Sequence, residues 1–393
     1  LKLGFIGGGT NSAVGTAHRI AVQMDHRWEI VAGCFSSNPE DEVNAETGAL
    51  CGVEAARIYA SWEEMLRAET DLLDAVVVLT PTPSHKEIVL GAVEKGFPVI
   101  CEKALAESSA DVREIRRAVQ RHKGFLAVTY NYTGYPMLRE LRRMIQDGAM
   151  GRVVQVFAEM PQEGYIRLNR DGKPNMPQAW RLEDHAVPVL SLDLGAHLHN
   201  IVGFLTGEAP VEAVAVHGSH GAFRQVVDNA IGIIRYTSGI TCNMWYSKCA
   251  LGCRNGLRVR VYGEKGAAEW YQANPETLNW WDEQGNQRVY DRSSGAALVS
   301  SEPRYNRFKV GHPAGFIEAF ANYYYDVADC LTDFKQTGQF RSPWVFGVQH
   351  AEEGLRLLEA LALSNRSRRW EPVSRCQETS PHASEGTAQS YAS

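Results

Sequence analysis

Asp193 and His197 stand four residues apart in a stretch, residues 191–207, whose apolar spacing predicts one continuous helix. Residues four apart share a helix face, so Asn200 lies one turn further on the same side while His199 points elsewhere. Histidine titrates near neutral pH and a neighbouring carboxylate can orient its ring, so the pair suits proton transfer. A helix-surface ion pair or a buried core histidine has the same spacing. Metal binding needs a third ligand, and because none stands nearby we predict no metal site.

Lys103 ends the run Cys101-Glu102-Lys103, directly after a strand predicted over residues 97–101. An earlier apolar strand, residues 73–79, opens into a proline-punctuated loop, Thr80-Pro81-Thr82-Pro83-Ser84-His85. Open α/β sheets bind ligands beyond the carboxyl ends of their strands, which is where Lys103 stands. A solvated lysine after a strand is the alternative interpretation.

A glycine-rich loop lies between the first predicted strand, residues 2–7, and the first predicted helix, residues 13–24. Glycines there allow a tight turn and close approach of the backbone to a pyrophosphate, and the helix amino terminus offers free N–H groups. The third glycine comes three residues later than the usual G-x-G-x-x-G spacing would place it. A purely structural turn is the alternative to dinucleotide binding. The loop residues expected to bind a cofactor are Gly7, Gly9, Thr10, Asn11 and Gly15.

The second predicted strand, residues 29–35, is followed by Ser36 and Ser37. A carboxylate at this point normally holds the ribose of NAD, and an arginine normally receives the 2′-phosphate of NADP. Neither is present, so the sequence leaves the choice between NAD and NADP open. The two serines could also form a simple turn.

The elements that must position these residues fall into two parts with a tail. Residues 1–130 alternate strand and helix patterns, which predicts a doubly wound parallel sheet. Residues 131–370 contain many strands with alternating polarity, which predicts an α+β domain with a large, open, mostly antiparallel sheet. A half-covered sheet often pairs with a copy of itself, so we expect a homo-oligomer. Residues 371–393 have almost no large apolar residues and are expected to be a disordered tail.

The composition excludes several classes of protein. The 393 residues are 44% hydrophobic and 22% charged, with a net charge of −6, which is typical of a soluble globular protein without a nucleic-acid footprint. No apolar run approaches the ~20 residues that a membrane span needs. The chain enters a strand at once, so we expect no signal peptide. Eight thinly spread cysteines favour reduced thiols in a cytoplasmic protein.

Taken in order, these motifs resemble the Gfo/Idh/MocA family of oxidoreductases, which includes glucose–fructose oxidoreductase and inositol dehydrogenases. The resemblance covers roughly residues 1 to 365. It rests on the glycine-rich first turn, the Thr80-Pro81-Thr82-Pro83-Ser84-His85 loop, Glu102-Lys103 and Asp193-x-x-x-His197. The segments Asn131-Tyr132-Thr133-Gly134-Tyr135-Pro136, Ala179-Trp180-Arg181 and Val261-Tyr262-Gly263-Glu264-Lys265-Gly266 agree with it.

The resemblance implies a Rossmann domain followed by an open-sheet α/β domain, with the active site between them. It implies that His197 takes the hydroxyl proton as hydride leaves for the nicotinamide, that Lys103 stabilises charge on the reacting oxygen, and that Asp193 orients substrate or His197. Further cofactor contacts would come from Thr80, Pro81, His85, Glu102, Lys103 and Asn131. Substrate contacts would come from Tyr132, Tyr165, Trp180, Arg181 and Asn200.

The chain departs from the family pattern at three points: Ala104 replaces the proline of Glu-Lys-Pro, the glycine loop is longer, and Asn200 stands where an aspartate is common. We predict an NAD(P)-dependent oxidoreductase acting on a secondary alcohol or ketone of a sugar, inositol or related polyol. One alternative is an NAD-dependent enzyme that performs elimination or glycoside cleavage without net redox change. The other is a non-catalytic nucleotide-binding sensor, which Ala104 and the altered loop would suit. We expect no nucleic-acid or membrane partner, and a dimer or tetramer formed through the open sheet.

Overall fold

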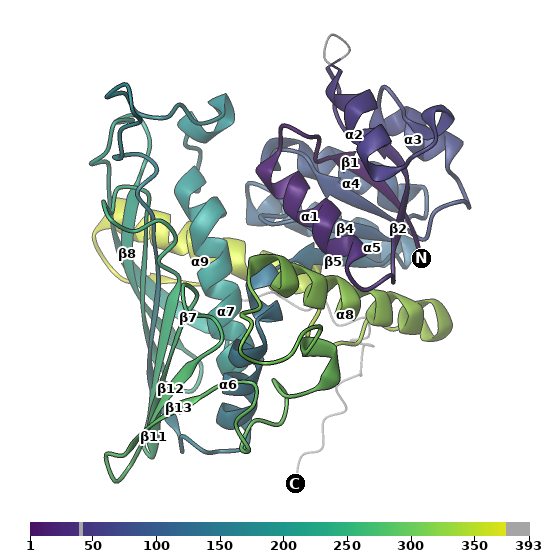
Figure 1. Ribbon diagram of the computed structural model, residues 1–393. Helices are drawn as coiled ribbons and strands as arrows, with labels where there is room; N and C mark the ends of the chain where they lie inside the picture. Colours follow the sequence, from purple (N-terminus) through teal and green to yellow (C-terminus); the bar gives the residue numbers. More distant parts are fainter. Residues whose placement is uncertain (39–41, 375–393) are drawn as a thin grey trace, which may run out of the picture.

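The computed structural model describes residues 1–38 and 42–374, which form two β-sheets with their helices (Figure 1). The first sheet has five parallel strands in the order β2-β1-β3-β4-β5. The second sheet has nine strands in the order β13-β12-β11-β10-β6-β9-β8-β7-β14, and only its β6–β9 pair is parallel among the described residues. The predicted fold class, a doubly wound parallel sheet followed by a large and mostly antiparallel one, is confirmed.

In the first part, strands and helices alternate as the sequence predicted. Strand β3 is buried along its whole length, as a strand covered on both faces must be. The elements are β1 (Lys2–Gly7), α1 (Ala13–Gln23), β2 (Glu29–Cys34), α2 (Val43–Cys51), η1 (Ala55–Arg57), α3 (Trp62–Ala68), β3 (Ala75–Leu79), α4 (Thr82–Glu94), β4 (Val99–Glu102), α5 (Ser109–His122), β5 (Leu126–Thr129) and η2 (Asn131–Gly134).

In the second part, the inner face of the large sheet packs on helices, and α9 lies along β7. The elements are α6 (Pro136–Gln146), β6 (Val153–Pro161), η3 (Ala179–Leu182), η4 (Ser191–Gly195), α7 (Ala196–Thr206), β7 (Pro210–Gly218), β8 (Asn229–Tyr236), β9 (Thr241–Ser247), β10 (Arg258–Gly263), β11 (Gly266–Tyr271), β12 (Leu278–Asp282), β13 (Gln287–Tyr290), η5 (Pro303–Tyr305), α8 (Phe316–Thr337), α9 (Val348–Ser367) and β14 (Glu371–Pro372).

Helix α8 follows β13 of the second sheet in the sequence but packs against the first sheet (Figure 1). Its buried residues Phe320, Tyr323 and Tyr324 share one apolar cluster with Leu3 and Phe5 of β1. The predicted domain boundary after residue 130 therefore separates the two sheets but not the two hydrophobic cores, because helix α8 packs against the first sheet. This return fixes the two parts against each other along the cleft that holds the site.

The chain's last described residues differ from the predicted tail. Glu371 and Pro372 form β14, which pairs antiparallel with β7, so order extends past residue 370. The remainder of the predicted tail, residues 375–393, lies outside the described residues. Within the described residues, none of the helices combines the length and the apolar character needed to cross a bilayer.

Candidate active site

The glycine loop joins β1 to α1 in a conformation that needs small residues. Gly7 and Gly8 have φ of 81° and 75°, in the left-handed region. Ser12 caps α1, its Oγ accepting the Gly15 N–H at 3.0 Å. A Cβ on Gly15 would lie 2.4 Å from the carbonyl oxygen of Gly8, so Gly15 allows the helix to pack closely on the loop. The late third glycine thus keeps the close-packing part of the fingerprint.

Arg19 of α1 supports this loop from behind. Its guanidinium donates to the carbonyl oxygens of both Gly8 and Gly9. Those oxygens would repel a phosphate, and Arg19 holds them on the helix side of the loop. Sequence reasoning missed Arg19, whose long side chain is buried beside the first helix turn.

A groove runs from this loop across the carboxyl ends of β1, β2 and β3. Predicted cofactor residues that line it are Gly7, Gly9, Asn11, Ser36, Ser37, Thr80 and Pro81. The groove opens into a second cavity through shared lining residues, Ser12, Leu79, Thr80, Pro81 and Gln178. An elongated ligand could therefore lie along both, which fits a dinucleotide with its phosphates at the α1 amino terminus. Thr10 does not line either cavity: its N–H donates to Thr47 Oγ1 at 3.0 Å and its side chain is exposed.

The second cavity also brings together His85, Glu102, Lys103 and Asn131. His85 is buried, with its ring nitrogens 2.8 Å from the Ala104 carbonyl oxygen and 2.7 Å from that of Thr80, so it ties two strand-end loops together. Burial lowers the pKa of His85. The peptide bond between Lys103 and Ala104 is cis.

A chain of hydrogen bonds that runs from α1 to α8 holds the Glu102 carboxylate in place. Its Oε1 lies 2.9 Å from Nε2 of the buried His18, and His18 Nδ1 lies 2.6 Å from the Tyr324 hydroxyl. The carboxylate at the cavity wall is therefore positioned by side chains from two helices, α1 and α8.

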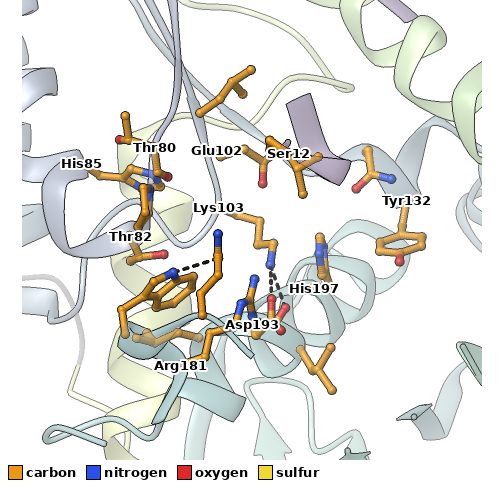
Figure 2. A pocket seen from close by; sticks show the side chains of 18 of the residues that line it. Ser12, Thr80, Thr82, His85, Glu102, Lys103, Tyr132, Arg181, Asp193 and His197 are labelled. Carbon is orange, nitrogen blue, oxygen red and sulfur yellow. Dashed lines mark hydrogen bonds and ion pairs between the residues drawn. The ribbon is translucent and has the colours of Figure 1, made fainter. Parts of the chain in front are cut away.

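Asp193 lines the cavity and contacts three cations, of which Lys103 and Arg181 are labelled in Figure 2. Lys103 Nζ donates to the Asp193 carbonyl oxygen at 2.8 Å and to Oδ1 at 3.1 Å, while Arg181 NH1 and Lys248 Nζ donate to Oδ2 at 2.6 and 2.5 Å. Burial alone would raise the pKa of Asp193, but Lys248, Lys103 and Arg181 together bring that pKa well below its usual value. Lys103 thus reaches across to the second domain, although Ala104 follows it instead of proline.

Lys248 is a central residue that sequence reasoning missed. It directly follows β9 and is almost completely buried, with Nζ 5.1 Å from the centre of the Tyr165 ring. Burial lowers the pKa of Lys248, and Asp193 opposes that effect. The position directly after a predicted strand, the criterion that selected Lys103, was the available signal.

His197, in the first turn of α7, lines the same cavity beside Tyr132. The two rings meet edge to face with centres 4.7 Å apart. His197 Nδ1 is buried and has no hydrogen-bond partner among the described residues. Burial and the nearby Lys103 ammonium hold the pKa of His197 well below its ordinary 6.5, and Asp193 opposes them only in part. The ring is therefore a neutral imidazole that can accept a proton from a ligand.

The remaining predicted substrate residues divide into two groups. Trp180 and Arg181 of η3 line the cavity, with the guanidinium carbon 4.4 Å from the indole ring centre. Tyr165 does not line it, but donates its hydroxyl to the Arg181 carbonyl at 3.3 Å. Asn200 faces away, with Nδ2 3.0 Å from His350 Nε2. Lining residues that the sequence analysis did not assign to the site include Ser12, Thr82, Gln162, Gln178, Phe316 and Phe320.

Comparison with known proteins agrees with this architecture. A family model described as an oxidoreductase family with an NAD-binding Rossmann fold matches residues 1–130, and the GFO/IDH/MocA C-terminal domain matches residues 138–269. The chain is 30% identical to an uncharacterized oxidoreductase, YfiI, of Bacillus subtilis (strain 168), over 82% of this chain and 84% of that protein. It is 25% identical to a levoglucosan dehydrogenase of Pseudarthrobacter phenanthrenivorans, over 68% of this chain and 72% of that protein. The crystal structure of an inositol dehydrogenase homolog from Azotobacter vinelandii, complexed with NADH and myo-inositol, superposes with a TM-score of 0.85 at 25% identity, covering 95% and 97% of the two chains.

Proposed function

This chain belongs to the Gfo/Idh/MocA family of NAD-binding oxidoreductases, and from that premise we propose that it transfers a hydride between NAD and a secondary alcohol or ketone of a sugar, inositol or related polyol. The observation that carries the proposal is the meeting of Lys103 from one sheet with Asp193 and His197 from the other part of the chain, around one cavity. That cavity continues into the glycine-loop groove, so a cofactor and a small substrate could share it.

The residues divide the chemistry between them. When bound, NAD supplies the hydride acceptor or donor. The backbone of Gly7 to Gly9 and the amino terminus of α1 would hold its phosphates. Neutral His197 accepts the hydroxyl proton as the alcohol is oxidised and returns it in reduction. The Lys103 ammonium hydrogen-bonds the reacting oxygen and stabilises negative charge on it. Asp193 keeps Lys103 in place and is a positioning residue.

Charge in the groove favours NAD over NADP. Among the described residues that line the groove none is lysine or arginine, and Glu87 contributes a carboxylate. A 2′-phosphate is normally received by an arginine, so it would find no cation there. We expect an affinity for NADH at least about tenfold above that for NADPH, because one missing charged contact costs about that factor.

The cavity wall supports a polyol substrate. The Trp180 and Tyr132 rings offer flat apolar surfaces for the C–H faces of a sugar ring, while Gln162 and Arg181 offer hydrogen bonds to hydroxyls. The levoglucosan dehydrogenase is named for such a substrate, and the inositol dehydrogenase homolog binds myo-inositol in its crystal structure.

We further propose that the chain forms a homo-oligomer through the outer face of its nine-stranded sheet. Val216, Ile231 and Ile233 of β7 and β8 are 70%, 53% and 36% exposed on that face. An apolar sheet face of this kind is typical of a buried subunit contact. Light scattering should give a mass above one chain, and Ile231→Lys should lower it.

The seven described cysteines are all free thiols, which supports a cytoplasmic location.

The test of the activity is NADH absorbance during incubation with NAD and a panel of inositols and sugars. We expect turnover in the wild type, and loss of turnover with retained NADH binding in Lys103→Met and His197→Ala. Exposed Lys95→Met and His122→Ala are matched controls that should keep activity. Product formed without net NADH change would identify an NAD-dependent non-redox enzyme instead. Turnover that persists in both active-site variants would show that the assigned roles are wrong.

A further inference from the structure

A second polar cluster lies between helices α7 and α9, outside the cavity that holds Lys103 and His197. His199 of α7 is fully buried, and neither of its ring nitrogens has a hydrogen-bond partner among the described residues. On α9, His350 and Glu353 face it three residues apart, on one side of that helix. Each of the three offers one ligand atom, and these atoms lie within 4.8 Å of one another.

The helix packing makes room for this cluster. A Cβ on Gly354 of α9 would lie 2.8 Å from Cδ2 of His199, and a Cβ on Gly203 of α7 would lie 3.3 Å from Cε1 of His350. Each helix thus has a glycine opposite the other helix's histidine. The two imidazoles stack with their centres 4.8 Å apart. Larger residues at either glycine would push the rings apart.

Among the described residues, the arginines near the cluster do not form ion pairs with Glu353, so its carboxylate is available to bind a metal ion. The neighbouring Arg116 and Arg356 both form ion pairs with Glu352 instead. Within the described residues, the ion-pair partner of Glu353 is His199, whose Nε2 lies 3.5 Å from its Oε1. The ligand atoms of a tetrahedral site with bonds of about 2.1 Å lie about 3.4 Å apart, so this pair already has suitable spacing.

We propose that His199, His350 and Glu353 bind a divalent zinc-class metal ion between α7 and α9. Two imidazoles and one carboxylate form a donor set that Zn²⁺ accepts and that Mg²⁺ and Ca²⁺ disfavour. His350 and Glu353 also line two surface cavities, which gives the ion a path of entry and water a path to an open coordination position. The metal would bind a ring nitrogen of His199, neither of whose ring nitrogens has a hydrogen-bond partner among the described residues.

This site departs from the sequence prediction of no metal. That prediction searched for ligands close to Asp193 and His197, whereas these ligands come from two helices far apart in the chain.

Zinc binding can be measured on the tag-free full chain after chelator treatment and dialysis against Zn²⁺. We expect about one zinc per chain, and at least about tenfold weaker binding in His199→Asn and Glu353→Gln, since loss of even an outer-shell partner costs that much. Exposed His122→Asn and Glu94→Gln are matched controls that should bind zinc like the wild type.

Replacement of zinc by Co²⁺ identifies the ligands. We expect visible d–d bands without a near-ultraviolet thiolate charge-transfer band, because the donors are nitrogen and oxygen. Less than about a tenth of a zinc per chain, a thiolate band, or unchanged binding in Glu353→Gln would each overturn the proposal. Glu353 is one-third exposed, so its glutamine variant should fold even if the variant of the buried His199 does not. The assay requires no turnover, so its result is independent of the proposed oxidoreductase activity.

Discussion

Replacing Asp193 by asparagine should destabilise the protein more than removing any one of the cations around it. Lys103, Arg181 and Lys248 all donate to this residue, and the asparagine variant leaves the buried Lys248 and two partly buried cations facing a neutral amide. Breaking a buried ion pair so that a charge remains uncompensated costs about 3–5 kcal/mol of unfolding free energy. Lys248→Met leaves Asp193 with two cations and relieves their repulsion, so it should cost only about 1.5–3 kcal/mol, the contribution of one hydrogen bond to a charged group.

The double variant separates this explanation from simple loss of packing. Once Asp193 is neutral, Lys248 is only a source of repulsion, so its removal should then restore stability. The combined loss should fall short of the sum of the single losses by about 1–3 kcal/mol. Urea denaturation of the wild type, both single variants and the double variant at neutral pH measures these differences.

The surface ion pair between Asp329 and Arg27 is the control, and additive stability losses at Asp193 and Lys248 would refute the reasoning. Asp329 pairs with Arg27 at 2.5 Å but is 56% exposed, so Asp329→Asn should cost less than about 1 kcal/mol. The reasoning fails if the Asp193 and Lys248 losses add to within about 0.5 kcal/mol, or if Lys248→Met costs as much as Asp193→Asn.

Three further predictions concern the cofactor loop and pH. Gly15→Ala should weaken NADH binding in fluorescence titrations, because the new Cβ would meet the Gly8 backbone. Gly164→Ala is the control, since Gly164 has open space around it and its replacement should leave NADH binding unchanged. Equal NADH affinities of the two variants would contradict the loop geometry. Because the pKa of His197 lies well below 6.5, initial-rate kcat/KM for alcohol oxidation should stay within about threefold down to pH 6.5 and fall only at lower pH. A titration centred on 6.5 would contradict the lowered pKa of His197. The free energy of unfolding should decrease below about pH 6.5, by up to about 1.4 kcal/mol per pH unit for each buried histidine. The reason is that the unfolded chain takes up protons that native His197, His199 and His350 do not. A urea midpoint that stays constant from neutral pH to about 5.5 would disprove this.

Much of the fold could be predicted because local patterns and tertiary packing agree. The apolar run of β3 and the capping serine before α3, whose side chain accepts the Glu64 N–H, both specify their elements locally. The sequence pattern predicts no strand over residues 287–290, where the structure has β13, because β13 is an edge strand whose four residues are exposed or half-exposed and show no alternation. The position of α8 on the first sheet could not be predicted, because an amphipathic helix does not record which of two cores it covers.

The candidate site was predictable where a general rule applied to the chain. Lys103 follows a parallel strand, and the carboxyl ends of parallel strands meet at one edge, so its position carried information. Lys248 follows β9, whose neighbour β8 is antiparallel, and in such a sheet strand ends point both ways. Its position after a predicted strand therefore marks Lys248 as a candidate but does not place it beside Asp193, with which it forms an ion pair.

The helix geometry around Asp193 explains why Asn200 does not lie on the helix face predicted for it, beside Asp193 and His197. Residues Ser191–Gly195 form a π-helical turn, η4, before α7 continues as an α-helix. A π-helical turn takes more residues than the 3.6 of an α-helix. Four residues then complete nearly one turn, which keeps His197 beside Asp193, but seven residues no longer complete two turns, so Asn200 rotates away from the cavity. It rotates toward His350, with which it makes contact at 3.0 Å. The one widened turn thus leaves Asp193 and His197 lining the same cavity and brings Asn200 to the cluster between α7 and α9.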